Sequence, residues 1–190
     1  FHYIRNPRLP HDLVLMPGIE PQLRWRAFTT TVIELARRVQ ASMVMTLGGL
    51  LADVVHSSPV RLTGQATRPE LFSNWRQMEV RTSRYEGPTG IVGVLSDACR
   101  REQLPTASIW ANVPHYINVS PNPKTLAAMV HRVNSLFELD LDLDDLDRAS
   151  DRFEQQVAEA VDQNPDVRQY IRQLEDAAGA EEEAEPAPAA

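Results

Sequence analysis

The sequence predicts an α/β protein in which helices cover both faces of a sheet. Three observations support this class: short apolar runs closed by glycine or proline, longer segments with apolar residues at helical spacing, and the alternation of the two along the chain. Such alternation is typical of a sheet with covered faces. With 190 residues, of which 43% are hydrophobic, the chain is long enough for one domain with a buried core.

The first half of the chain is expected to contain three strands and a helix. The strands cover residues 11–16, 42–47 and 60–66. Between the first two, residues 21–39 carry apolar side chains at helical spacing, which predicts an amphipathic helix. Gly48-Gly49 is expected to end the second strand. Thr67-Arg68-Pro69-Glu70 resembles a helix start, because proline is favoured in the first turn.

The second half is expected to contain one more strand and four helices. The helices cover residues 88–103, 122–137, 149–161 and 165–177. Thr89 is the expected N-cap of the first of them. The strand at residues 107–113 is followed directly by Pro114-His115-Tyr116. Residues 179–190 contain only Gly, Ala, Glu and Pro, which have too little to bury and predict disorder.

Three regions follow from this pattern. They are an α/β/α domain at residues 1–138, a C-terminal helical segment at 139–178 and a disordered acidic tail at 179–190. Residues 1–137 hold 15 basic and 9 acidic residues, whereas residues 138–190 hold 4 and 17. The basic residues are scattered rather than gathered with aromatic residues on one element, so nucleic-acid binding is not expected.

Composition also excludes several other classes. No apolar run approaches the roughly 20 residues that cross a bilayer, and the single cysteine, Cys99, cannot form an internal disulfide. No signal peptide is visible, so we expect a cytoplasmic protein. The five histidines lack zinc-like spacing, and no phosphate-binding or dinucleotide-binding glycine motif is present. No metal and no cofactor are therefore expected.

Gly48 and Gly49 are the first candidate ligand-binding residues. Glycine has no Cβ, so the backbone at this pair could approach a ligand closely. The alternative, which we prefer, is that the pair only makes the turn from the strand into the following loop.

His115 and Tyr116 are the candidate catalytic residues if the protein is an enzyme. They follow a strand, and the carboxyl ends of strands line ligand crevices in open α/β sheets. A neutral imidazole there could serve as acid or base. No nucleophile or carboxylate pair accompanies them, so we prefer a structural role in which His115 makes a buried hydrogen bond to neighbouring backbone.

Thr67 and Arg68 complete the set of candidate ligand-binding residues. A helix N-terminus beside a guanidinium can hold an anion. The pair can equally be a helix cap, with Arg68 paired to a carboxylate, and the sequence leaves both interpretations open.

Several stretches together resemble the proteasome assembly chaperone family (second-subunit type), in particular its actinobacterial members. The order and spacing of the stretches carry the resemblance more than any one of them. They are Leu47-Gly48-Gly49-Leu50, Pro59-Val60-Arg61, residues 66–71, residues 87–95, Val113-Pro114-His115-Tyr116 and residues 141–149.

The resemblance implies a three-layer α/β/α sandwich similar to that of the purine nucleoside phosphorylases, followed by C-terminal helices. It also implies that the first strands of the sheet precede Phe1. Family members self-associate, so a homo-oligomer is expected, with a trimer preferred. Proteasome-binding members commonly end in a hydrophobic-Tyr-X tail; this chain ends in Pro188-Ala189-Ala190, so docking through such a tail is not expected.

These inferences predict a non-enzymatic, bacterial assembly chaperone or scaffold that acts through contacts with itself and with proteasome subunits, and that binds neither nucleic acid nor membrane. The alternative is an enzyme or small-ligand-binding protein that uses a crevice at the strand carboxyl ends. If the candidates converge on a concave, partly polar pocket, the enzyme or ligand-binding function is favoured. If they form a packed cluster, the scaffold is favoured. The six candidates are Gly48, Gly49, Thr67, Arg68, His115 and Tyr116.

Overall fold

The structure is a computed structural model that describes residues 1–5, 12–68, 80–82 and 90–184. It confirms the α/β class: the described ranges form two sheets and five helices. No helix in these ranges is long and apolar enough to cross a membrane.

The chain divides into two compact units, each built from three separate segments. Unit 1 comprises Phe1–Leu47, Thr63–Ile109 and Arg132–Leu141. Unit 2 comprises Gly48–Leu62, Trp110–His131 and Asp142–Ala190. The sequence division at residue 138 stays a prediction.

The larger sheet has four strands in the order β3-β6-β4-β5. Their bounds are Val44–Ala52 for β3, Thr106–Pro114 for β6, Leu62–Ala66 for β4 and Val80–Thr82 for β5. Two bonds show that β3 and β6 are parallel: Val44 N–H donates to Pro105 O, and His115 N–H donates to Ala52 O. The bonds from β6 to β4 run in opposite order, so that pair is antiparallel.

A second, two-stranded sheet lies in unit 1. Strand β1 (His2–Ile4) pairs antiparallel with β2 (Leu13–Leu15), which places His2 opposite Leu15. Strand β2 lies within the strand predicted at residues 11–16.

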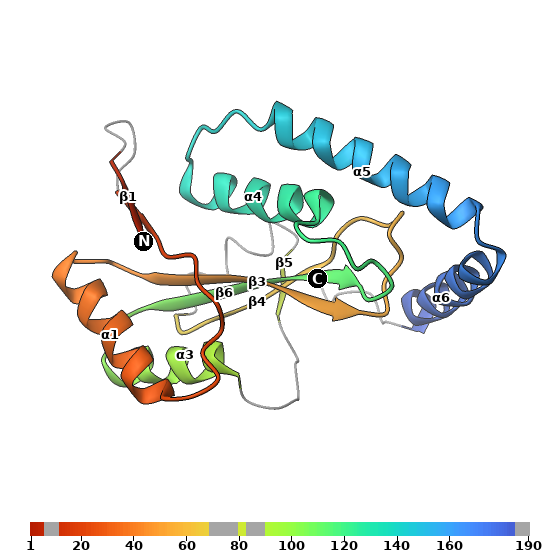
Figure 1. Ribbon diagram of the computed structural model, residues 1–190. Helices are drawn as coiled ribbons and strands as arrows, with labels where there is room; N and C mark the ends of the chain where they lie inside the picture. The colour runs from red at the N-terminus through yellow and green to blue at the C-terminus, as the bar shows by residue number, and fades with distance from the viewer. Residues whose placement is uncertain (6–11, 69–79, 83–89, 185–190) are drawn as a thin grey trace. The chain divides into compact units, whose positions relative to one another are not determined.

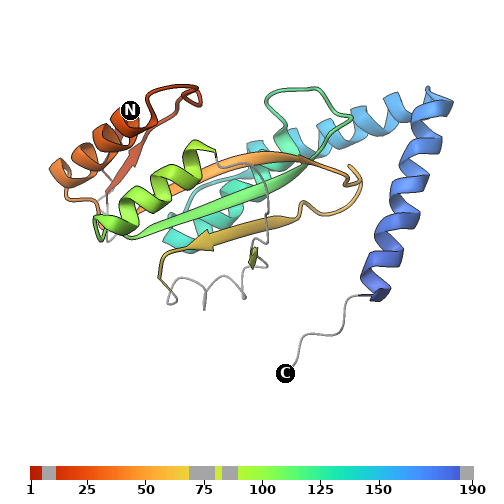
Figure 2. The ribbon, with the colours of Figure 1, turned by 90° about the horizontal axis from the view of Figure 1, so that it is seen from below.

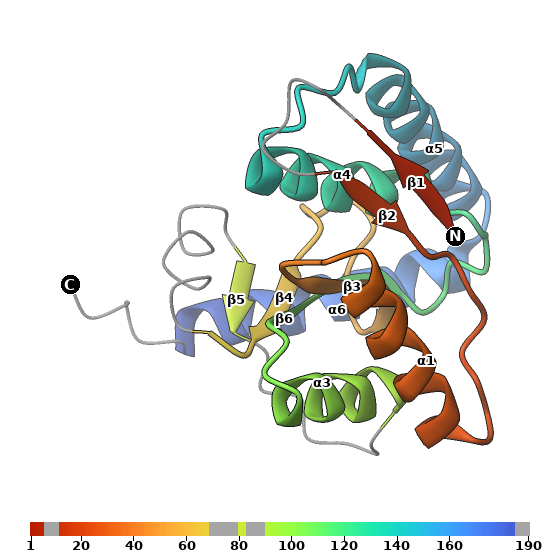
Figure 3. The same ribbon diagram turned by 90° about the vertical axis from the view of Figure 1, so that its left-hand side faces the viewer.

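The core of unit 1 lies between helices α1 (Trp25–Arg38) and α3 (Ile91–Arg101). Figures 1 and 3 show the two helices side by side against one side of the strands. Both helices are amphipathic, and their apolar stripes meet in a cluster. The buried members of that cluster are Val32, Ile33, Leu95 and Cys99. Cys99 is fully buried, and this burial raises the pKa of its thiol.

The N-terminus of α3 is capped by a residue from another part of the chain. Gly90 is the N-cap and offers no side-chain bond, while Oε1 of Glu20 accepts from the Ile91 N–H at 3.3 Å. A carboxylate is favourable at a helix N-terminus, where several N–H groups lack helical partners. The predicted cap, Thr89, lies outside the described residues.

Strand β3 does not end where the sequence suggested. It continues through Gly48 and Gly49 to Ala52, so the interpretation of this pair as a turn was wrong. A Cβ on Gly48 would lie 2.7 Å from the ring of Trp110 on β6. Glycine is needed here because an indole ring packs directly on the strand, rather than because the chain turns.

Three helices follow β6. Helix α4 (Pro123–Phe137) begins as predicted, with Oδ1 of Asn122 accepting the Thr125 N–H at 3.0 Å. Helix α5 (Asp144–Asp162) begins five residues earlier than expected. Helix α6 (Pro165–Ala184) extends into the region predicted to be a disordered tail. Figure 2 shows α5 and α6, both in unit 2, running in different directions.

Candidate functional site

The candidate site lies in unit 2, where β3 and β6 end. The loop after β3 carries Asp53 and His56, and the residues directly after β6 are His115 and Tyr116. Because the two strands are parallel neighbours, their carboxyl ends meet at one edge of the sheet. We call His56, His115 and Tyr116 the strand-end cluster.

His56 and Tyr116 are joined by two hydrogen-bond contacts. The Tyr116 hydroxyl accepts the His56 backbone N–H at 2.8 Å and lies 2.9 Å from its Nδ1. Burial, followed by the charge of Lys124, lowers the pKa of His56, and burial raises the pKa of Tyr116. Both effects favour the neutral forms, in which the hydroxyl can donate to Nδ1.

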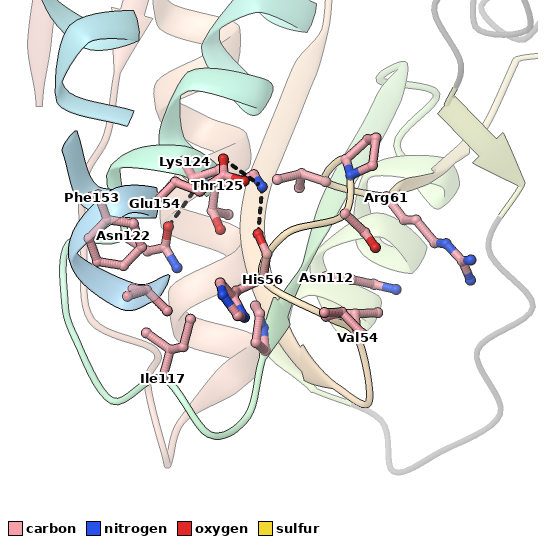
Figure 4. Close-up of a pocket in the computed structure, with 16 residues that line it drawn as sticks. Val54, His56, Arg61, Asn112, Ile117, Asn122, Lys124, Thr125, Phe153 and Glu154 are labelled. Carbon is pink, nitrogen blue, oxygen red and sulfur yellow. Dashed lines mark hydrogen bonds and ion pairs between the residues drawn. The ribbon is translucent and has the colours of Figure 1, made fainter. Parts of the chain in front are cut away.

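Lys124, on α4, connects the loop after β3 to α4 and α5. Its Nζ donates to the carbonyl oxygen of His56 and lies 2.9 Å from a carboxylate oxygen of Glu154 on α5. Figure 4 shows these two contacts converging on the ammonium group. The Lys124 side chain is only 17% exposed. A shielded ion pair with a further hydrogen bond is suited to holding elements together, and it neutralises the one lysine of the chain.

A small hollow that is partly open to solvent lies beside this ion pair. Its polar lining includes His56, Arg61, Asn112, Asn122, Lys124 and Glu154, and Val55, Phe153 and Val157 are among its apolar lining residues. None of the six candidates from the sequence lines it. Figure 4 shows the guanidinium of Arg61 pointing away from Lys124.

His115 is held by three neighbours. Its Nδ1 lies 3.1 Å from Asp53 Oδ1 and 3.3 Å from the Ala52 carbonyl oxygen, and its Nε2 lies 3.0 Å from the Tyr170 hydroxyl. The His115 side chain is 37% exposed, so the prediction that its hydrogen bond to backbone is buried was wrong. The expected backbone partner is present, together with two side-chain partners that the sequence did not indicate.

Aromatic rings pack against one another across the strand-end cluster. The ring of His115 makes edge-on contacts with Tyr116 and Tyr170, each with 5.7 Å between ring centroids. His56 packs edge-on against Tyr116 at 6.0 Å. Edge-on geometry is favourable because the positive edge of one ring meets the negative face of another. The three rings of the cluster thus pack against one another and against Tyr170.

The other four candidates lie elsewhere. Gly48 packs against Trp110, and Gly49 would bring a Cβ to 3.2 Å from Val113. Thr67 belongs to unit 1, where its hydroxyl accepts from the Thr106 N–H at 2.9 Å. Arg68 is exposed in the same unit, and the helix predicted to follow it lies outside the described residues. Of the candidate set, His115 and Tyr116 make a ring contact with each other, and neither the Gly48-Gly49 pair nor the Thr67-Arg68 pair joins them in the contacts of the described residues.

Four residues of the site were not singled out from the sequence as ligands or catalysts: His56, Lys124, Glu154 and Tyr170. A signal for His56 existed, since it follows a strand that is parallel to β6. Ending that strand at Leu47 placed the loop five residues too early and concealed the relation. Lys124, Glu154 and Tyr170 come from three helices whose packing no local pattern indicates. Across the described ranges, no group of three or more histidine, cysteine or acidic residues could hold a metal ion.

Comparison with families and solved structures places these features in context. A family model described as the PAC2 family matches residues 1–161. A PAC2 family protein of Streptomyces avermitilis has 36% sequence identity and a TM-score of 0.75, and the match covers 88% of this chain and 69% of that chain. The comparison with curated proteins found no match.

Two further structures are similar. A proteasome-assembly chaperone homologue of Mycobacterium tuberculosis has 35% identity and a TM-score of 0.76, over 89% of this chain and 70% of that chain. PbaA of Pyrococcus furiosus, an archaeal homologue of proteasome-assembly chaperone, has 18% identity and a TM-score of 0.58, over 77% of this chain and 64% of that chain. At that identity the archaeal likeness shows the fold alone.

Proposed function

Because this chain belongs to the PAC2 family, we propose that it is a cytoplasmic assembly chaperone or scaffold that acts through protein–protein contacts with itself and with proteasome subunits. The similar protein of Mycobacterium tuberculosis is described as a proteasome-assembly chaperone homologue, at 35% identity over 70% of its length. This likeness supports the choice of partner class.

The observation that carries the proposal is the apolar surface of the N-terminal segment in unit 1. Large apolar side chains that are between 41% and 95% exposed gather there: Phe1, Tyr3, Ile4, Leu15, Met16, Ile19 and Leu23. Two of them, Ile19 and Leu23, are 95% and 80% exposed. Seven exposed large apolar side chains within 23 residues exceed the single exposed apolar residues that are normal on a surface, and they favour a protein-interaction surface.

The two-stranded sheet adds to this argument. β1 and β2 have three residues each, and an isolated two-stranded sheet is marginally stable in water. All three residues of β1 are exposed. A covering partner would stabilise this sheet by removing its apolar side chains from water.

The strand-end cluster supports contact rather than catalysis. Within the described residues, the side-chain partners of His115 are the exposed carboxylate of Asp53 and the phenol of Tyr170, and no serine or cysteine is hydrogen-bonded to its imidazole. Protease-like chemistry needs a serine or cysteine nucleophile beside a base in one open site. The ring of His115 packs instead against the rings of Tyr116 and Tyr170.

The proposal is tested by sedimentation velocity with purified proteasome α and β subunits of an actinobacterium. We expect the full chain to cosediment with unassembled subunits, and the double variant Ile19→Ser/Leu23→Ser to bind at least tenfold more weakly. Val119→Ser is the matched control, because Val119 is 54% exposed but belongs to unit 2. Absence of binding by the unaltered chain at tens of micromolar would contradict the proposal.

A further inference from the structure

Helix α6 lies on the strand-end cluster through one apolar stripe. The stripe consists of Val167, Tyr170, Ile171 and Leu174, which recur at helical spacing and are half-buried or buried. Ile171 is 6% exposed, whereas Gln169 and Gln173 are exposed. The helix therefore has one inward face, and Tyr170 is the residue of that face that contacts the cluster.

Tyr170 makes the specific contacts of this stripe. Its hydroxyl lies 3.0 Å from His115 Nε2, and its ring packs edge-on against His115 and Tyr116 with centroid separations of 5.7 and 6.4 Å. An aromatic residue with a polar tip suits a surface that offers both rings and a hydrogen-bond partner. The cluster is thus complementary to a helix that carries tyrosine beside aliphatic residues.

Helix α6 is joined to the rest of unit 2 by a short link. Only Gln163 and Asn164 separate it from α5, and the family match ends at residue 161, before α6 begins. Helix α5 has two attachments to α4 that do not involve α6: Lys124 pairs with Glu154, and His131 lies 2.7 Å from Asp147. Release of α6 would leave these contacts intact.

The attachment of α6 is modest in comparison. In the part of α6 whose side chains the structure describes, Ile171 is the one buried residue, and one side-chain hydrogen bond reaches the cluster, at a histidine that is itself 37% exposed. Arg168 adds exposed contacts to Asp162, at the adjoining end of α5. Elements with few buried apolar contacts open locally at a lower free energy than the core. The helix has the properties of a cover that can be displaced.

We propose that the strand-end cluster is a docking surface for an amphipathic helix of a partner protein, and that α6 masks this surface in the free chain by occupying it. The partner helix carries a tyrosine followed by aliphatic residues one and four positions later, as α6 does at Tyr170, Ile171 and Leu174. The inference goes beyond the proposed function, because it holds whether or not the partner is a proteasome subunit.

The first test uses a fluorescent peptide of residues 163–178 and the full-length protein. We expect the peptide to bind the double variant Tyr170→Ala/Ile171→Ala at least tenfold more tightly than the unaltered chain, because a masked surface is available only for the fraction of time that its cover is open. Gln169→Ala/Gln173→Ala, which changes only exposed residues of α6, should bind as weakly as the unaltered chain. Equal affinities for the masked and unmasked proteins, or no binding to either, would overturn the proposal.

A second comparison locates the peptide. Adding His115→Ala to the unmasked variant should weaken peptide binding severalfold, since the bond to the peptide tyrosine is lost. An unchanged affinity would place the peptide elsewhere and overturn the proposal. Hydrogen exchange on the unaltered full chain provides an independent measurement: α6 amides should exchange at least tenfold faster than the α5 amides around Phe153. Equal protection would mean that α6 opens only with the core and does not act as a cover.

Discussion

The hydroxyl of Tyr116 accepts the backbone N–H of His56 at 2.8 Å while lying 2.9 Å from its imidazole. One phenol thus fixes both the backbone and the side chain of a residue sixty positions earlier in the chain. Since each residue follows the end of one of two parallel strands, the contact holds the two loops together. Proton transfer is not needed to explain it.

Tyr116→Phe should therefore lower stability. The change removes the acceptor of a partly buried N–H but keeps the ring contacts, and we expect a loss of about 1–2 kcal/mol in the free energy of unfolding. Urea denaturation followed by circular dichroism measures this loss. Tyr3→Phe is the matched control, because the bond from Tyr3 to Asp12 is exposed and should contribute less. Equal losses for the two variants would show that the His56 contact has no special weight.

The lowered pKa of His56 predicts a pH dependence of stability. Its cause is burial first and the charge of Lys124 second. As pH falls, the unfolded chain takes up a proton at His56 near its pKa of about 6.5, whereas the folded chain takes it up only at a lower pH. The stability that neutral His56 contributes is therefore present above about pH 6.5 and is lost as the pH falls further. Between pH 7 and pH 5, the melting temperature of His56→Gln should fall less than that of the parent.

His2→Gln is the control for this titration. His2 is exposed on β1, so the variant should follow the pH profile of the unaltered chain. Identical profiles for the parent and His56→Gln would show that His56 titrates alike in the folded and unfolded states, contrary to the prediction.

Gly48→Ala tests why glycine stands inside a strand. The added Cβ would lie 2.7 Å from the Trp110 ring, so the indole must move, and we expect a loss of about 1–3 kcal/mol. Gly18→Ala is the matched control, because nothing lies within 4 Å of its added Cβ; it should be neutral or slightly stabilising. Differential scanning calorimetry of both variants is sufficient. A parent-like melt for Gly48→Ala would mean that the ring adjusts freely.

Self-association should depend on the apolar N-terminal surface. We expect the unaltered chain to sediment at micromolar concentration as a homo-oligomer, with a trimer preferred from the family resemblance. Ile19→Ser/Leu23→Ser should shift it toward the 21.4 kDa monomer, because these side chains are 95% and 80% exposed in the single chain. A parent that is monomeric at every concentration would refute this expectation.

Much of the fold could be predicted from the sequence, since amphipathic periodicity and apolar runs are local properties. The α/β class and the family resemblance are confirmed by the structure and by the PAC2 match. The errors arose where distant residues decide the outcome. Gly48-Gly49 lies inside β3, where the Trp110 ring packs against Gly48. The carboxylate that caps α3 comes from Glu20, 71 positions before Ile91.

The candidate site was predictable only in part. His115 and Tyr116 were found because the rule about strand ends needs only one correctly placed strand. His56 was missed because the strand was predicted to end at Leu47, whereas β3 ends at Ala52. Tyr170 reaches His115 through helix packing across 55 positions, which no spacing in the sequence encodes.

The most direct test of the proposed function is the rate at which purified actinobacterial proteasome α and β subunits form the assembled particle. Native gel electrophoresis and the appearance of peptidase activity follow this rate with and without one equivalent of the full-length protein. We expect assembly to accelerate at least severalfold, with no change in the activity per assembled particle. An unchanged assembly rate, at protein concentrations that saturate any binding, would contradict the assignment of this chain as an assembly chaperone.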